Sequence, residues 1–252
     1  MLLDSYSKIF LIIRPPAGAA EERFGRYMKR SMHTHRDEMF IATKAGHPMW
    51  PGPYGDWGSR KSLVASLDQS LRRMNLEYVD VYYSHRYDPN TPLEETMQAL
   101  VDIVRSGKAL YVGLSKYPEE AARKAYAYLE ENHVHCILYQ GRYNMLTRQP
   151  EEVIIPQAHK NGTGFIAFSP LAQGLLTDRY LQGVPDGSRM STSQFLRPEA
   201  LTDELVINSG LSTRLLLSVD NRWPRLQAFT RNFPIIFFSC IIRKRETQLT
   251  GY

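Results

Sequence analysis

Short apolar segments alternate with helix-like segments from about residue 38 to residue 169. The apolar segments are rich in β-branched and aromatic residues and are bounded by polar turns, a pattern that predicts strands. We expect five of them, at Glu38–Thr43, Tyr78–Tyr83, Ala109–Leu114, His135–Tyr139 and Gly164–Phe168. The regular alternation implies parallel strands joined by crossover helices, and therefore an α/β fold.

The segments between the strands have helical periodicity. Apolar residues recur every three or four positions at Leu63, Leu67, Leu71 and Met74. A second helix is expected to begin at a capping box in the sequence TPLE at 91–94 and to end at a glycine after Ser106. A closed barrel and an open doubly wound sheet both satisfy this pattern.

Both ends of the chain depart from the alternation. Ser7–Ile13 predicts only a poor strand, and the apolar run Phe233–Ile242 predicts a further one near the other end. We therefore expect a core over residues 1–205, in which 1–14 are atypical, and an atypical tail over 206–252 without a domain of its own.

The net positive charge of the chain comes from that tail. The formal net charge of the 252 residues is +5, and the segment Thr213–Tyr252 contains seven basic and two acidic residues. The rest of the chain is neutral overall, so the charge distribution argues against nucleic acid as a partner.

Cysteine and histidine usage excludes other classes. Cys136 and Cys240 show no pairing pattern, which favours a reducing compartment, and we expect a cytoplasmic protein. The apolar runs are shorter than the ~20 residues that span a bilayer, so no membrane span is expected. The two H-x-H pairs have no evident third ligand, so we expect no metal site.

Polar residues follow the carboxyl ends of the predicted strands. In a parallel barrel these ends converge on one rim, where function resides. They carry a lysine, a histidine, a hydroxyl, an amide and an aromatic ring, at Lys44, His85, Ser115, Gln140 and Phe168. Each has an ordinary explanation alone, as an exposed lysine, a satisfied histidine or a turn residue. Their joint placement predicts a functional site.

Long contiguous runs between Pro15 and Leu205 resemble the aldo-keto reductase superfamily, in the branch of bacterial glyceraldehyde-3-phosphate/methylglyoxal reductases and voltage-gated potassium channel β subunits. The runs include AEERFGR (20–26), IATKAG (41–46), SLDQSLRRMNLEYVDVYYSHRYDPNTPLEET (66–96), SGKALYVGLSKY (106–117) and FIAFSPLAQGLLTDRYL (165–181). The resemblance implies a (β/α)8 TIM barrel. Because the family's first and last strands have no counterpart, we expect a truncated, incomplete or irregularly closed barrel, whose open seam would favour a homo-oligomer.

The resemblance also implies a chemistry, the NADPH-dependent reduction of small aldehydes and ketones to alcohols. It makes Lys44 the lysine that supports the family's tyrosine proton donor, and His85 the histidine that binds the substrate carbonyl. Arg86 becomes a neighbour for anionic groups of the substrate. The resemblance places Trp50, Tyr54 and Trp57 in a loop that covers the substrate, although a merely packed aromatic loop is an equal alternative.

The cofactor contacts implied by the resemblance come from three strand ends and two later arginines. Serine and amide groups would hold the nicotinamide, an aromatic ring would stack on it, and the loop after the last core strand would meet the pyrophosphate. The residues concerned are Ser115, Lys116, Gln140, Phe168, Ser169, Pro170, Leu171, Gly174, Arg179 and Arg189.

Two departures from the family predict impaired function. The positions of the catalytic tyrosine and aspartate hold Ile13 and Lys8, and Arg14 replaces a glycine. The segment that grips the adenosine 2′-phosphate has no counterpart after Leu205, so weakened NADPH binding is expected. A nucleotide-binding module like the channel β subunits, or a non-catalytic family remnant, are the alternatives, and His85 favours the enzyme branch.

Overall fold

The computed structural model describes residues 7–9, 17–176, 180, 183–186, 188 and 235–236. They fall into two compact units. The first holds the residues up to Gln140 together with Val153–Gly164, and the second holds Gly141–Glu152 and the residues from Phe165 onward. The boundary expected between residues 205 and 206 lies outside the described residues.

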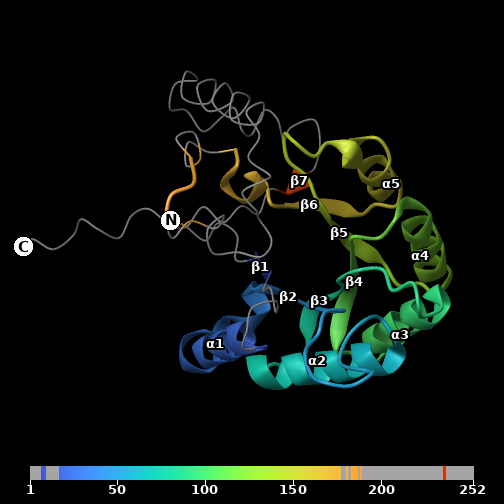
Figure 1. Cartoon of the computed structure of the whole chain (residues 1–252). Coiled ribbons are helices and arrows are strands. Elements are labelled where there is room, and N and C mark those ends of the chain that lie inside the picture. The colour runs from blue at the N-terminus through green and yellow to red at the C-terminus, as the bar shows by residue number, and fades with distance from the viewer. Residues whose placement is uncertain are drawn as a thin grey trace, which may run out of the picture. The chain divides into compact units, whose positions relative to one another are not determined.

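A half-barrel of parallel strands forms the centre of the first unit (Figure 1). Each strand pairs in parallel with the next one along the chain. All six residues of β3 are buried, as in a parallel strand that is covered on both faces. The strands are β1 (Ser7–Ile9), β2 (Phe40–Ala45), β3 (Val79–Ser84), β4 (Ala109–Ser115) and β5 (Cys136–Arg142), whose last two residues enter the second unit.

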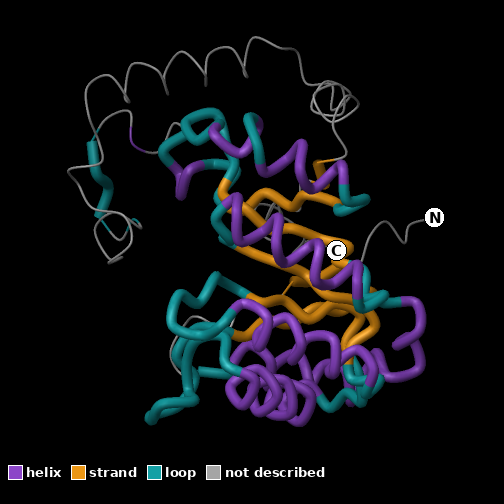
Figure 2. Tube along the Cα trace, turned by 90° about the vertical axis from the view of Figure 1, so that its right-hand side faces the viewer, coloured by secondary structure: helices purple, strands orange, loops and turns teal. Residues whose placement is uncertain are grey.

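Helices of the first unit pack on the outer side of these strands (Figures 1 and 2). The leucine stripe predicted for one of them is fully or nearly buried, which confirms that helix. It begins at Ser59, whose hydroxyl accepts a hydrogen bond from the Ser62 N–H. The helices are α1 (Ala19–Tyr27), α2 (Arg60–Met74), α3 (Leu93–Arg105), α4 (Glu119–Glu131) and α5 (Ile154–Lys160), with a π-helix at Met28–Met32 and a 3-10 helix at His33–Glu38 before β2.

The predicted end of α3 is confirmed, but its predicted start is wrong. Gly107, directly after the helix, has a φ of 76°, a left-handed conformation that glycine adopts without strain. At the other end Pro92 is the N-cap and no side chain caps the helix. The Thr91 hydroxyl instead donates to the buried Asp88 carboxylate at 2.7 Å. This bond directs the Thr91 side chain to Asp88, and its oxygen accepts no hydrogen bond from the N–H groups of the helix.

The second unit contains two strands that pair in parallel, β6 (Gly164–Phe168) and β7 (Ile235–Ile236). The first residue of β6, Gly164, still belongs to the first unit. The Tyr143 ring packs edge-on against Phe165, with 6.1 Å between the ring centroids. Short 3-10 helices lie at Gln149–Glu151 and Ala172–Gly174.

The sequence prediction of an α/β fold with an incomplete barrel is therefore confirmed. The five core strands occur with boundaries displaced by at most three residues, and the poorer strands appear as β1 and β7. Within the described part of the chain, no helix has the length and apolar character needed to cross a bilayer.

Candidate active site

The strand pairing aligns the predicted polar residues at one rim of the half-barrel. Lys44 on β2 pairs with Tyr83 on β3, and Ser115 on β4 pairs with Gln140 on β5. The His85 N–H continues the pairing beyond β3 by donating to the Ala45 carbonyl at 2.8 Å. The carboxyl ends of β2 to β5 thus bring Lys44, His85, Ser115, Lys116 and Gln140 together.

Lys44 is the most deeply placed cationic side chain of this rim. It is 2% exposed, and its Nζ donates a hydrogen bond to the Gln140 Oε1. The Nζ also lies 5.4 Å from the centroid of the Tyr83 ring. Burial, and secondarily the charge of Lys116, lower the pKa of Lys44 to about 7. Among the described residues, no carboxylate forms an ion pair with Lys44.

Two histidines stack beside this lysine. The rings of His47 and His85 meet edge to face, with 4.4 Å between centroids. Burial lowers the pKa of His47 to about 4, helped by Lys116 and Arg86, and burial followed by Lys44 lowers the pKa of His85 further. Both imidazoles are therefore neutral at pH 7, and each has one N–H donor and one nitrogen acceptor.

His47 was missed by the sequence prediction. Its position three residues after Lys44, at the end of β2, was the available signal, because residues just beyond a barrel strand still lie on the rim. Its Nε2 is 3.5 Å from the Lys116 Nζ. Lys116 has a φ of 53°, an unusual conformation for a residue with a side chain, and its N–H donates to the Gln140 carbonyl.

The Arg86 guanidinium is bound by other groups of the protein. Its guanidinium makes two hydrogen bonds to the Asp56 carboxylate, at 2.7 and 2.8 Å, and stacks on the Trp57 ring at 3.6 Å. Its Nε donates to the Gly46 carbonyl. This arrangement fastens the loop before α2 to the ends of β2 and β3.

The other two predicted loop aromatics face a helix. Trp50 and Tyr54 line a surface hollow together with Lys61, Ala65 and Gln69 of α2. The Lys61 Nζ lies 4.5 Å from the Tyr54 ring centroid. Both rings thus lie against α2, and their contact with a substrate stays a prediction.

Asp88 fixes the other side of the same loop and was not singled out from the sequence. Its carboxylate accepts hydrogen bonds from the Gly58 N–H at 2.9 Å, the Asn90 N–H at 2.9 Å and the Thr91 hydroxyl at 2.7 Å. Burial raises the pKa of Asp88, but these bonds outweigh it and hold the pKa below its ordinary value.

Two tyrosines near the rim, Tyr83 and Tyr117, are buried and poorly acidic. The Tyr83 hydroxyl is buried without a hydrogen-bond partner in the described part of the chain, and burial raises its pKa strongly. The Tyr117 and Ser84 hydroxyls lie 2.7 Å apart, and burial also raises the pKa of Tyr117. Tyr87 packs its ring edge-on against Tyr117 at 5.7 Å.

The predicted aspartate and tyrosine positions fall mostly outside the described residues. Ile13 and Arg14 lie outside them. Lys8 is part of β1, where its backbone pairs with Ile41. That register is three residues before Lys44 on the neighbouring strand. Among the described side chains, the like charge that acts on Lys44 is that of Lys116.

The second unit holds the predicted stacking and loop residues. The Arg142 guanidinium lies 6.0 Å from the Phe168 ring centroid, and Asn144 donates to the Ser169 carbonyl at 2.9 Å. Ser169 and Gly174 bound a tight turn and have positive φ angles of 55° and 106°. The same turn contains Pro170 and Leu171, whereas Arg179 and Arg189 lie outside the described residues.

One feature tests whether the rim suits a nicotinamide cofactor. The Ser115 Oγ is fully buried and has no hydrogen-bond partner among the residues that the structure describes. Gln140, which pairs with Ser115 in the sheet, adds an amide. A buried, unpaired hydroxyl beside an amide fits the donors and acceptors of a carboxamide, so these residues are compatible with the nicotinamide group.

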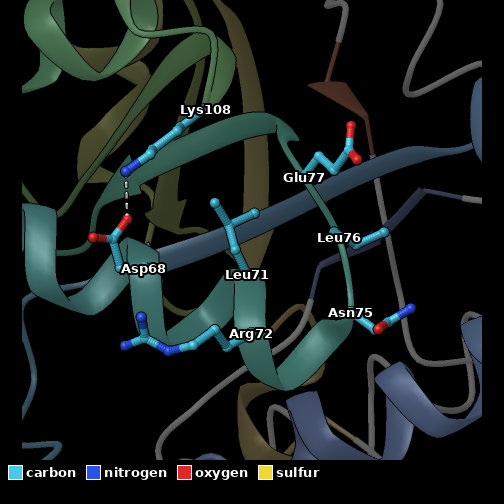
Figure 3. Close-up of a pocket in the computed structure, with 7 residues that line it drawn as sticks. All are labelled: Asp68, Leu71, Arg72, Asn75, Leu76, Glu77 and Lys108. Atoms are coloured by element: carbon cyan, nitrogen blue, oxygen red, sulfur yellow. Dashed lines mark hydrogen bonds and ion pairs between the residues drawn. The ribbon is translucent and has the colours of Figure 1, made fainter.

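A second hollow lies at the opposite end of the strands. It is formed by the end of α2 and by residues just before β3 and β4, and Figure 3 shows its Lys108–Asp68 ion pair of 2.8 Å. Because the residues before the strands form the stability face of such barrels, this hollow is not the candidate site.

These features, a parallel half-barrel with a lysine, two histidines and an amide at the carboxyl ends of its strands, define an α/β-barrel protein with a polar site at one rim. The sequence model of the aldo/keto reductase family matches residues 4–228, and the chain belongs to that family. This confirms the resemblance drawn from the sequence motifs.

The chain is similar to curated proteins named L-glyceraldehyde 3-phosphate reductase. Those of Escherichia coli O157:H7 and strain K12 are each 50% identical over 205 residues, or 81% of this chain. The chain spans 59% of the length of these relatives.

Two solved structures are also similar. A glycerol dehydrogenase from Gluconobacter oxydans superimposes with a TM-score of 0.68 over 87% of this chain and 67% of its own, at 22% identity. A thermostable aldo-keto reductase bound to the inhibitor epalrestat gives a TM-score of 0.52 at 30% identity, over 63% of this chain and 53% of its own. The first likeness supports the fold.

Proposed function

We propose that this chain is the core of an NADPH-dependent aldo-keto reductase that reduces small aldehydes and ketones to alcohols, with slow turnover as it stands. The observation that carries the proposal is the meeting of Lys44, His85 and Gln140, with Ser115, at one rim. The names of the E. coli relatives support a three-carbon aldehyde such as glyceraldehyde 3-phosphate as the substrate.

Neutral histidine is suited to orient the carbonyl. The lowered pKa of His85 leaves an imidazole N–H that can donate to the carbonyl oxygen without carrying a full charge. Lys44, in its protonated fraction, adds positive potential where negative charge develops on that oxygen. Ser115 and Gln140 would hold the carboxamide of the bound cofactor, which supplies the hydride.

The missing element is an acid for the nascent alkoxide. In the family pattern a tyrosine fills this role, and Ile13 stands at its position. The raised pKa values of Tyr83 and Tyr117 make both phenols poor substitutes. General-acid assistance is typically worth ~100- to 10,000-fold in rate, which is the deficit we expect here.

The test is a repaired variant that combines Lys8→Asp, Ile13→Tyr and Arg14→Gly. NADPH oxidation with glyceraldehyde should rise by about two to four orders of magnitude over the unaltered chain. The same triple variant carrying His85→Ala is the control and should lose most of the gain. Equal rates in the repaired and unaltered chains would contradict the assignment of the missing donor.

A second candidate is a nucleotide-binding module without turnover, favoured by the raised pKa values of the rim phenols Tyr83 and Tyr117. Trp57, stacked on Arg86 beside the rim, is a natural reporter of binding. Saturable quenching of tryptophan fluorescence by NADPH, without aldehyde-dependent NADPH oxidation, would favour this module. The absence of any saturable quenching would favour a non-catalytic family remnant.

A further inference from the structure

The partner of Lys44 is a neutral amide rather than a carboxylate. Its Nζ donates to the Gln140 Oε1, and among the described residues no Asp or Glu forms an ion pair with it. A buried ammonium without a counter-ion is costly, whereas a neutral amine can occupy the same place while keeping one hydrogen bond. The site therefore favours the form of lysine that carries a lone pair.

The groups that face Lys44 come from every neighbouring strand end. Gln140 approaches from β5 and Tyr83 from β3, His85 and His47 follow β3 and β2, and Lys116 follows β4. Only Lys116 among them is charged at pH 7. Desolvation and an adjacent cation are the two conditions known to turn a lysine into a nucleophile, and Lys44 meets both.

We propose that Lys44 is a nucleophilic amine that forms a Schiff base with small aldehydes, a covalent activity that needs no cofactor. The Nζ lone pair attacks the carbonyl carbon, forming a C–N bond while the C=O π pair moves to oxygen. That oxygen takes up a proton as the nitrogen loses one, giving a carbinolamine. The hydroxyl group then takes up one proton and leaves as water, and the nitrogen gives up its remaining proton, so that a neutral imine to Lys44 remains.

The surrounding residues supply the proton transfers of this sequence. The low pKa of His85 keeps its imidazole neutral, so its N–H can donate to the carbonyl oxygen while the proton that the nitrogen loses passes to that oxygen. The Lys116 ammonium, whose charge acts on Lys44, is the proton source for the departing water. The net reaction joins aldehyde and amine and releases water, with no change of oxidation state.

The depth of the site limits the substrate class. Lys44 is 2% exposed and is enclosed by side chains of four strand ends, so the reactive compounds should be small and unbranched. Two- and three-carbon aldehydes fit this description. Bulky aromatic aldehydes should react only with surface lysines.

The test traps the imine by reduction in the complete chain, without NADPH. The chain is incubated with propanal and cyanoborohydride at pH 7, and the propylation of each lysine is followed by peptide mass spectrometry. An exposed lysine is about 0.04% neutral at that pH, so Lys44 should be labelled on the order of a hundredfold faster, or more, than Lys124, a lysine on the exposed face of α4. Labelling of Lys44 no faster than of Lys124 would overturn the proposal.

Two variants give an independent reading. Lys116→Met removes the neighbouring cation and should move the pH midpoint of Lys44 labelling upward, which a purely structural role of Lys116 would not do. Lys124→Arg is the matched control and should leave the midpoint unchanged. An unchanged midpoint in folded Lys116→Met protein would contradict the role of that charge. Because no cofactor is present, a failure here is distinct from a failure of aldehyde reduction.

Discussion

The Lys44 Nζ donates to the Gln140 amide oxygen across the rim of the half-barrel, from β2 to β5. Among the described residues, the hydrogen-bond partner of the Lys44 side chain is therefore a group without charge. The acid–base state of Lys44 therefore depends on what stands at position 140, and that dependence can be measured.

Replacing Gln140 by Glu should restore a counter-ion to Lys44. An opposite charge within hydrogen-bonding distance raises the pKa of a lysine by about 1–3 units, so labelling of Lys44 by propanal should need correspondingly higher pH. The midpoint is read from trapping yield against pH. Gln149→Glu, at an exposed position in the second unit, is the control and should not move it.

Burial of Lys44 should make the chain more stable at alkaline pH. Its folded pKa of about 7 lies below the unfolded value of 10.5, so the unfolded chain binds more protons between these two values and stability rises with pH across that window. The rise should be roughly a few kcal/mol, reached by pH 10. Urea unfolding at pH 7, 8 and 9 measures it, and Lys44→Met should flatten the slope. An equal slope in both proteins would show that Lys44 is not its cause.

The histidine pair should make the chain acid-sensitive. The folded pKa of His47 is about 4 and that of His85 is lower still, whereas an unfolded histidine titrates near 6.5. The contribution of the two neutral histidines to the stability of the fold is therefore fully present above pH 6.5. It is lost as the pH falls through about 4. His47→Gln should reduce this loss, measured as the melting temperature at pH 7 and pH 5. His35→Gln, an exposed histidine, should not.

Breaking the Arg86–Asp56 contact should loosen the loop before α2. Asp56→Asn leaves a partly buried guanidinium stacked on Trp57 without its carboxylate, at a cost of about 1–2 kcal/mol. Urea unfolding gives the stability change, and limited proteolysis shows whether the loop has opened. Glu120→Gln breaks a contact between exposed partners on α4 and should leave the stability nearly unchanged. Similar losses in both variants would deny Asp56 this role.

Removing the Ser115 hydroxyl should separate binding from stability. That hydroxyl is buried and has no hydrogen-bond partner in the described part of the chain, so Ser115→Ala should leave stability unchanged or slightly raised. NADPH affinity should fall about tenfold if the hydroxyl binds the carboxamide. Tryptophan fluorescence titration compares this variant with Ser66→Ala, a buried serine on α2. Unaltered affinity would remove Ser115 from the cofactor site.

Much of the fold could be predicted because its signals are local. An apolar run bounded by turns, such as Tyr78–Tyr83, predicts a strand from its own residues alone. A leucine stripe at helical spacing, as in α2, predicts a helix in the same way. The strand ends could be assigned to one rim for the same reason, since parallel strands place their carboxyl ends together. Thr91 is an exception, because its hydroxyl is bonded to a buried carboxylate rather than to the helix that follows it.

The chemistry of the rim depends on distances between residues far apart in the chain. A lysine at a strand end carries no sign of its protonation state, which for Lys44 follows from burial, from an amide at position 140 and from a cation at position 116. Arg86 likewise has the chemistry of an anion binder in the sequence, but Asp56 and Trp57 occupy its guanidinium in the fold. Local pattern sets where such groups lie along the backbone, while desolvation and charge–charge interactions, which act through space, set what they can do.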